Sequence, residues 1–252
     1  MSFPARIVFL TRSLNYGGSE RQLVALVIGL HHDGQSTAVA TFYPGGPFQH
    51  SLESAGVPVF SLGKHSRWDV VGFAWRLIRF VRRAKPDILH GYLGTANILA
   101  VCLKPFCPGM KVIWGVRASN MELERYGRLD RLLYWIECRT SQFADVIVVN
   151  SHVGLEYAVS HGFPREKMIV IANGIDTERF HPNRQARTRF RGKWGIQADE
   201  NLIGLVGRLD PMKGHLTFVN AAALLTRKRP NVRFVCVGDG PEQYQRRLVA
   251  LA

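Results

Sequence analysis

Acidic residues are scarce in this chain. Its 252 residues include 19 Asp and Glu against 33 Lys and Arg, which leaves a formal net charge of +14. An excess of one sign on this scale predicts an acidic partner, which can be nucleic acid, an anionic membrane surface or a phosphorylated substrate. The charge by itself does not choose among the three.

Cysteines, long apolar runs and catalytic signatures are also few or missing. The four cysteines form no C-x-x-C pair and have no companion histidine at metal-ligand spacing, which favours reduced thiols in a cytosolic protein. No run reaches the roughly 18 to 20 apolar residues that span a bilayer, and MSFPARIVFLTRSL at the N-terminus does not resemble an export signal. We therefore expect a cytoplasmic protein, either soluble or peripheral to the inner face of the membrane. G-x-S-x-G, H-E-x-x-H and EF-hand patterns are absent as well.

Short apolar runs rich in Val and Ile alternate with amphipathic segments along the first two thirds of the chain. The runs cover residues 5–10, 37–43, 57–60, 86–90, 111–116, 145–150 and 167–173, and the clearest helical patterns cover 19–34, 68–83 and 124–143. Such alternation predicts a doubly wound α/β domain with a parallel sheet. We assign residues 1–173 to this Rossmann-like domain.

The pattern changes after Asn173. Residues 174–200 contain Pro182, several glycines and a basic run but no strand pattern, so we interpret them as an interdomain connection with a helix. Alternation resumes with strands at 201–207 and 232–238 and helices from about His215 and Pro241. Two parallel strands do not make a sheet that is covered on both faces, so we expect residues 201–252 to be a partial second domain.

The turn GRLDPMKG, residues 207–214, carries Arg208 and Lys213 between two glycines. It follows a strand and precedes a helix, and open α/β folds bind ligands at this edge of the sheet, where helix amino ends favour anions. Arg offers a planar fork and Lys a point charge, which together suit a diphosphate. The alternative is a surface turn with two solvated cations.

A second glycine turn, NYGGSERQL, follows the first predicted strand. Gly17 and Gly18 would let backbone N–H groups face a ligand, with Ser19 capping a helix that starts at Glu20. The alternative is a plain glycine turn with a helix cap.

Three polar residues lie at or just after the ends of the fourth and fifth predicted strands. His90 ends the strand PDILH and would lie at the same edge of the sheet, where it could hydrogen-bond a substrate hydroxyl or stabilise developing charge. Arg117 and Asn120 follow KVIWGV and could line an acceptor site or the same crevice. The alternatives are a structural histidine and two polar loop residues.

The helical segment 68–83 combines aromatic and basic residues. Such a helix could lie on an anionic membrane, or it could bury its apolar side on the sheet and leave the arginines in water. The residues concerned are Trp68, Phe73, Trp75, Arg76, Arg79, Arg82 and Arg83.

Taken together, these motifs resemble the retaining glycosyltransferases of family four. The resemblance rests on GG after the first strand, His90, NGID-x-x-x-F at 173–180, GR-x-x-x-x-KG at 207–214 and VGDGP at 237–241. It implies the GT-B architecture of two Rossmann-like domains with a nucleotide sugar in the cleft. It also implies that Arg208 and Lys213 neutralise the donor diphosphate, that the loop of Gly17 and Gly18 closes over donor phosphate and sugar, that His90 stabilises the transition state, and that no metal or other cofactor is required.

The chain departs from the family pattern in one respect. The family carries an E-x-x-x-x-x-x-x-E motif further along the second domain, whereas Glu242 is the last glutamate here. We therefore expect a C-terminally truncated hexosyltransferase with little activity of its own. Its parent would transfer sugar to a glycan or lipid-linked acceptor in polysaccharide or envelope glycoconjugate synthesis. The rival hypothesis is a non-catalytic basic module that binds nucleic acid or anionic membrane; under the first reading no specific nucleic acid partner is expected.

Overall fold

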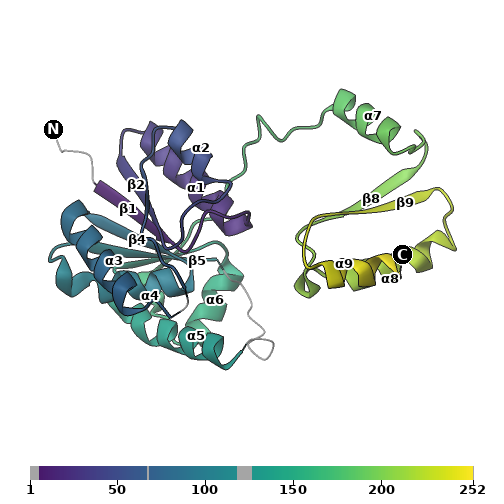
Figure 1. Cartoon of the computed structure of the whole chain (residues 1–252). Helices are drawn as coiled ribbons and strands as arrows, with labels where there is room; N and C mark the ends of the chain where they lie inside the picture. The colour runs from purple at the N-terminus through teal and green to yellow at the C-terminus, as the bar shows by residue number, and fades with distance from the viewer. Residues whose placement is uncertain (1–5, 67, 118–126, 252) are drawn as a thin grey trace. The chain divides into compact units, whose positions relative to one another are not determined.

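The computed structural model describes residues 6–66, 68–117 and 127–251. The chain divides into two compact units, one ending at Ile175 and the other beginning at Asp176. Each contains a parallel sheet and helices, so the predicted α/β class is confirmed (Figure 1). We call them unit 1 and unit 2 and describe each by itself.

Unit 1 is built on a seven-stranded sheet with the order β3-β2-β1-β4-β5-β6-β7, in which every pairing is parallel. The strand order runs outward in both directions from the β1/β4 pair, which makes this pair the topological switch point of the sheet. The strands are β1 (Arg6–Thr11), β2 (Ser36–Thr41), β3 (Val59–Ser61), β4 (Ile88–Tyr92), β5 (Lys111–Val116), β6 (Val146–Val149) and β7 (Met168–Val170).

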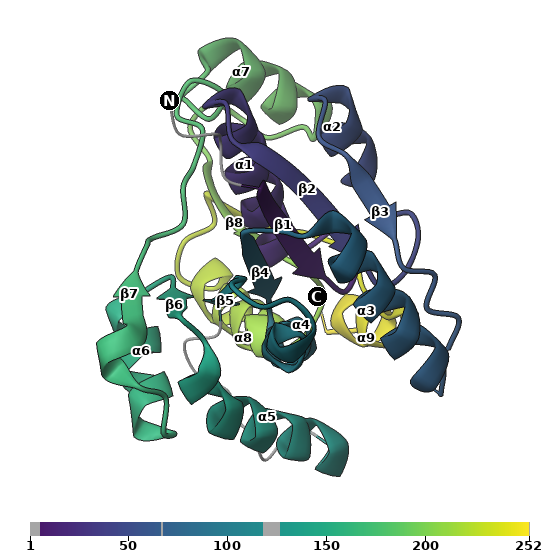
Figure 2. The ribbon, with the colours of Figure 1, turned by 90° about the vertical axis from the view of Figure 1, so that its left-hand side faces the viewer.

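Helices cover the two faces of this sheet unequally. Right-handed crossovers place α1 (Gly18–His32) and α2 (Gln49–Ser54) on one face, and α3 (Val71–Ala84), α4 (Gly94–Cys102), α5 (Arg128–Thr140) and α6 (His152–Ser160) on the other. The buried side chains separate in the same way into two cores. Helix α5 packs mainly on α4 and lies farther from the sheet (Figure 2). Short 3₁₀ turns occupy Lys104–Phe106, Ser141–Phe143 and Arg165–Lys167.

The sequence of unit 1 explains why its strands lie inside. Leu10 and Trp114 are fully buried in the core beneath α3, α4 and α6, and Phe9 and Tyr92 are buried in the core beneath α1 and α2. Neighbouring residues of one strand therefore point into opposite cores, which requires the continuous apolar runs seen in the sequence.

One strand boundary differs from the prediction and changes how a candidate residue is placed. Strand β4 continues through Gly91 to Tyr92, so His90 is its third residue and does not end it. Gly91 stays in the strand because it packs directly against α4: a Cβ there would lie 2.8 Å from the carbonyl oxygen of Ala96.

Unit 2 contains one parallel pair of strands, β8 (Asn201–Val206) and β9 (Val232–Val237). Helix α7 (Arg184–Lys193) precedes them and is capped by Asn183, whose side chain accepts a hydrogen bond from the Ala186 amide. Helix α8 (His215–Thr226) connects the strands, a 3₁₀ turn (Pro211–Lys213) leads into it, and α9 (Glu242–Val249) follows β9. The predicted pattern of two strand-helix units is confirmed within the residues described.

No helix in the described ranges is long and apolar enough to cross a membrane. Over the same residues, no three His, Cys, Asp or Glu side chains converge in a way that could hold a metal ion.

Candidate functional site

The turn with Arg208 and Lys213 lies at the carboxyl end of β8, as the sequence predicts. The strand ends at Val206, and the chain then enters α8 through Gly214. Gly214 has φ +72°, in the left-handed region that glycine adopts without strain. Asp210 fixes the turn in between, because its carboxylate accepts a hydrogen bond of 2.9 Å from the Met212 amide.

A second loop, residues 238–240, runs beside this turn. Gly207 donates to the Val237 carbonyl and Leu209 donates to the Asp239 carbonyl, both at 2.9 Å. A Cβ on Gly238 would lie 1.8 Å from the carbonyl oxygen of Gly207, and one on Gly240 would lie 2.4 Å from that of Leu209. The two glycines of VGDGP are therefore required because only a chain without Cβ atoms can approach the Arg208 turn this closely.

Arg208 and Lys213 flank Gly207. The Arg208 side chain is 67% exposed, and its Nη2 donates to Asp210 Oδ2 at 2.9 Å. The stem of Lys213 runs past Gly207, with its Cγ 3.8 Å from where a Gly207 Cβ would be. The Met212 amide, the Arg208 guanidinium and the Lys213 charge together hold the pKa of Asp210 below its ordinary value. A bound diphosphate would have to compete with this carboxylate for Arg208.

His215 lies directly after this turn and was not among the predicted site residues. It is fully buried as the first residue of α8, and its ring meets that of Tyr244 edge to face at 6.2 Å. Neither ring nitrogen has a hydrogen-bond partner among the residues described. A single histidine after KG gives no sequence signal for burial, which depends on α9 packing beside it.

The glycine turn of unit 1 begins α1 differently from the prediction. The helix starts at Gly18 with Gly17 as its N-cap, and no side chain caps it, so the assignment of Ser19 as the cap is wrong. The Glu20 carboxylate instead turns back over Gly17, where a Cβ would lie 2.0 Å from its Oε2. Gly17 thus leaves space for an acidic group at the positive end of the helix.

His90 is buried beneath α1. Its ring lies 5.0 Å from that of Phe9 and 5.7 Å from that of Tyr92, and its Nε2 has no partner in the described part of the chain. Burial, followed by the nearby Arg117 charge, lowers the pKa of His90 from 6.5 to about 3. The ring is therefore neutral at physiological pH and can act only as a neutral hydrogen-bonding group.

Arg117 follows β5 and connects three elements of unit 1. Its guanidinium lies 5.1 Å from the centre of the Tyr92 ring, and its Nη1 donates to Asn173 Oδ1 at 3.0 Å. Burial raises the pKa of the Tyr92 hydroxyl, and Arg117 opposes the shift. The other predicted residue of this loop, Asn120, lies outside the described residues.

The segment after β7 is also tied to α1. Gln22 donates from Nε2 to the Gly174 carbonyl at 2.7 Å and accepts from the Gly174 amide at 2.9 Å. His90, Arg117 and Asn173 thus share one edge of the unit 1 sheet with the first turns of α1. Tyr92, Gln22 and the Asn173 contact were missed from the sequence, although Tyr92 is two residues from His90 and so must share its face of the sheet.

A buried polar pair supports the neighbouring turn. Leu93 has φ +72°, an uncommon conformation for a branched side chain, and α4 begins immediately after it. Asn97 Nδ2 donates to Glu137 Oε1 at 2.9 Å and lies 3.4 Å from the Gly115 carbonyl oxygen. Burial raises the pKa of Glu137, and the Asn97 hydrogen bond opposes it.

Two sequence-family models match the chain. The model of Glycosyltransferase Family 4 matches residues 16–179, and that of Glycosyl transferases group 1 matches residues 186–252. These matches favour the glycosyltransferase interpretation over a non-catalytic nucleic-acid or membrane module.

Three curated relatives match parts of the chain. A stretch of 77 residues, 31% of this chain and 20% of the relative, is 39% identical to the putative glycosyltransferase EpsF of Bacillus subtilis. A stretch of 104 residues is 32% identical to a GDP-mannose-dependent phosphatidylinositol monomannoside mannosyltransferase of Mycolicibacterium smegmatis. It covers 41% of this chain and 27% of the relative. A third stretch, of 167 residues, is 24% identical to the UDP-Gal:alpha-D-GlcNAc-diphosphoundecaprenol alpha-1,3-galactosyltransferase of Escherichia coli. It covers 65% of this chain and 43% of the relative. The chain thus spans less than half the length of each.

The fold is similar to that of Anabaena HepE. The structure of HepE with UDP-glucose superposes with a TM-score of 0.81 and 20% sequence identity, over 98% of this chain and 65% of HepE. A glycosyltransferase from Rickettsia africae superposes with a TM-score of 0.69 and 16% sequence identity, over 98% of this chain and 64% of the Rickettsia protein. The likeness confirms the predicted GT-B type of α/β fold.

Proposed function

We propose, from the premise that the chain belongs to Glycosyltransferase Family 4, that it is part of an enzyme that transfers a hexose from a nucleotide sugar. The acceptor is a glycan or a lipid-linked sugar, the transfer retains the anomeric configuration, and the product is a polysaccharide or envelope glycoconjugate. No metal is assigned to the reaction.

The observation that carries this proposal is the turn of Arg208 and Lys213. Both cations stand at the carboxyl end of β8, next to Gly207 and before α8. As the bond between sugar and diphosphate breaks, negative charge builds up on the leaving group. Cations and backbone N–H groups placed at this point stabilise that charge.

Asp210 sets how the turn would take its ligand. In the free protein it pairs with Arg208, which keeps the guanidinium on the turn. An arriving diphosphate replaces the carboxylate as the partner of Arg208, while Asp210 keeps its hydrogen bond from Met212. The guanidinium is thus held near its working position at the cost of one ion pair at the surface, worth roughly 1 kcal/mol or less.

Unit 1 would supply the acceptor side. We assign the Gly17–Gly18 turn to the donor phosphate and sugar, and Arg117 and Asn120 to the acceptor or the cleft. His90 would contribute a neutral hydrogen bond and not a positive charge, since burial keeps its ring unprotonated.

A lipid-linked acceptor is supported by the names of two relatives. The mycobacterial relative is a phosphatidylinositol monomannoside mannosyltransferase, and the Escherichia coli relative acts on a diphosphoundecaprenol-linked sugar. Both names contain a sugar that is attached to a lipid. HepE, which has the similar fold, was crystallised with UDP-glucose, which supports a nucleotide-sugar donor.

The test is donor binding, because the chain spans only part of its relatives. Isothermal titration with UDP, GDP, UDP-glucose and inorganic pyrophosphate should detect binding of a diphosphate. Arg208→Gln and Lys213→Gln should each weaken it by roughly tenfold, since a charge-assisted hydrogen bond contributes about 1.5 kcal/mol or more.

The matched control is Arg233→Gln. Arg233 pairs with Glu200 at the amino end of β9, the opposite end of the sheet from the turn. Diphosphate binding that is equally strong in wild type, R208Q and K213Q would refute the assignment, and so would equal losses in all three variants.

A further inference from the structure

Two helices on the same face of unit 1 carry the same exposed pair of side chains. On α3, Arg79 lies over the Trp75 ring at 5.2 Å, and on α5, Arg139 lies over the Trp135 ring at 5.4 Å. The tryptophans are 60% and 55% exposed. In both pairs the arginine follows the tryptophan by four residues, so the two side chains meet on the outer side of their helix.

Helix α3 divides cleanly into an inner and an outer side. Phe73, Leu77 and Val81 are buried in the core, as one of the two sequence hypotheses stated. The outer side keeps Val71 and Trp75 exposed beside arginines, so burial does not account for all of the aromatic residues.

Arg76 does not belong to that outer side. It bonds the carbonyl oxygens of Leu62 and Gly63 at 2.8 and 3.0 Å and pairs with Asp69 at 2.5 Å. It therefore stabilises the loop before α3, and the basic residues left at the surface are Arg79, Arg82 and Arg83.

Helix α5 repeats the arrangement and was not singled out from the sequence. At 100° per residue, Arg128, Leu132, Trp135 and Arg139 fall within an arc of about 60°. All four are exposed. Asp130 lies on the opposite side of the helix, so this arc carries no carboxylate.

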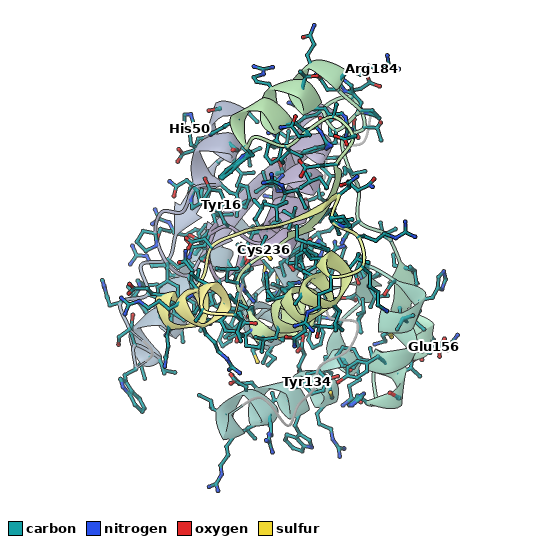
Figure 3. All side chains as sticks on the ribbon, turned by 90° about the vertical axis from the view of Figure 1, so that its right-hand side faces the viewer. Tyr16, His50, Tyr134, Glu156, Arg184 and Cys236 are labelled. Atoms are coloured by element: carbon teal, nitrogen blue, oxygen red, sulfur yellow. The ribbon has the colours of Figure 1, made fainter. Side chains whose placement is uncertain are left out.

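A basic groove of about 380 Å³ continues this surface toward α6. Arg131, Tyr134 and Arg139 line it from α5, and His161 closes it after α6. The His161 ring contacts the Tyr134 ring at 5.6 Å and the Tyr157 ring at 4.3 Å. Figure 3 labels Tyr134 on α5 and Glu156 on α6, which locates the two helices that flank the groove.

We propose that this face of unit 1, formed by the outer sides of α3 and α5, rests on an anionic lipid surface. Indole rings belong at the level of lipid headgroups, arginines bind their phosphates, and Leu and Val side chains enter the acyl boundary. The charge complements such a surface, since each arginine near anionic lipid adds to the attraction. This inference goes beyond the proposed function, because neither donor nor acceptor takes part in it.

Other partners fit these side chains less well. Nucleic acid would use the arginines but leave exposed Val71, Leu129 and Leu132 without a role. A protein partner would need an acidic surface interrupted by apolar pockets on two separate helices. A bilayer supplies phosphate and apolar depth together across the width of both helices.

The experiment is co-sedimentation of the 252-residue chain with vesicles in 100 mM salt. We expect binding to vesicles of three parts phosphatidylcholine to one part phosphatidylglycerol, and much weaker binding to phosphatidylcholine alone. R79Q/R82Q on α3 and R128Q/R139Q on α5 should each lower the partition coefficient by about thirtyfold, from about 1 kcal/mol per arginine. W75A/W135A should lower it as well, which separates apolar insertion from charge.

The matched control is R184Q/R187Q, two exposed arginines of α7 in unit 2. It removes the same charge and should leave vesicle binding within about twofold of wild type. All substituted side chains are exposed, and circular dichroism checks that the variants fold. Equal losses in the control, or no binding to anionic vesicles, would overturn the proposal; so would tight binding to RNA or an acidic protein with none to vesicles. Because no sugar nucleotide is present, this result stands apart from the donor-binding test.

Discussion

The contact between Gly238 and the Arg208 turn allows a sharp test of the candidate donor site. A Cβ at position 238 would lie 1.8 Å from the Gly207 carbonyl oxygen, whereas real Cβ contacts below 3.0 Å are essentially unknown. Gly238→Ala must therefore move the two loops apart by more than 1 Å. That movement breaks or strains the hydrogen bonds from Gly207 to Val237 and from Leu209 to Asp239.

The expected cost follows from these contacts. Two backbone hydrogen bonds contribute about 1 kcal/mol each, and forcing an extra methyl into a filled space costs about 1–3 kcal/mol. We expect Gly238→Ala to destabilise unit 2 by about 3–5 kcal/mol. A displacement of about 1 Å in a group that positions a substrate can lower a reaction rate about a hundredfold. Pyrophosphate binding should therefore fall by at least tenfold even where unit 2 remains folded.

Amide hydrogen exchange measures the contact directly. In Gly238→Ala the amides of Gly207 and Leu209 should exchange much faster than in wild type. Gly204→Ala is the control, because a Cβ there lies 3.4 Å from Val235 Cγ1, a contact that needs little or no adjustment. If G238A and G204A show the same exchange rates, urea midpoints and pyrophosphate affinity, the reasoning from the loop contact is refuted.

Three further predictions concern charged and titrating groups. Asp210→Asn should raise pyrophosphate affinity about fivefold in calorimetry, because it frees Arg208 and removes a like charge worth about 1 kcal/mol while the amide oxygen can keep the Met212 bond; unchanged or weaker binding would contradict it. The raised pKa of Glu137 means that the folded protein binds more protons above pH 4.5, so its free energy of unfolding falls as pH rises. Glu137→Gln should therefore gain more stability over wild type at pH 7 than at pH 4.5 in urea titrations, and an equal difference at both would exclude this titration as the cause. The pKa shift of His90 has the opposite sign, since its pKa of about 3 lies below the ordinary value of 6.5. The free energy of unfolding therefore falls as pH drops from 6.5 toward 3, and His90→Leu should lessen that fall.

Local patterns in the sequence predicted the strands of both units and several of the helices. Continuous Val and Ile runs identified the buried parallel strands, because a strand covered on both faces must be apolar at every position. Glycine and proline identified the turns, and the position of Arg208 and Lys213 beyond β8 followed from the strand and helix that flank them. Each of these signals depends on neighbours only a few residues away.

The outcomes that sequence reasoning missed depend on tertiary contacts that the local pattern does not show. Arg76 looked like a surface cation until the fold brought Asp69 and the loop carbonyls to it. His90 looked like the end of a strand, but Phe9 and Tyr92 enclose it and α1 covers that face. Neither outcome follows from residue type.

The sequence by itself therefore determined where the strands, several helices and the cationic turn occur, because hydrophobic period and turn chemistry act over short distances. The tertiary structure decided what surrounds each candidate group. It paired Arg117 with Asn173, which lies 56 residues away, and it placed Gly238 against Gly207 so that a missing Cβ became a requirement. It also buried His90 deeply enough to keep it neutral. Protonation and close approach depend on everything packed around a group, and only the folded chain supplies those neighbours.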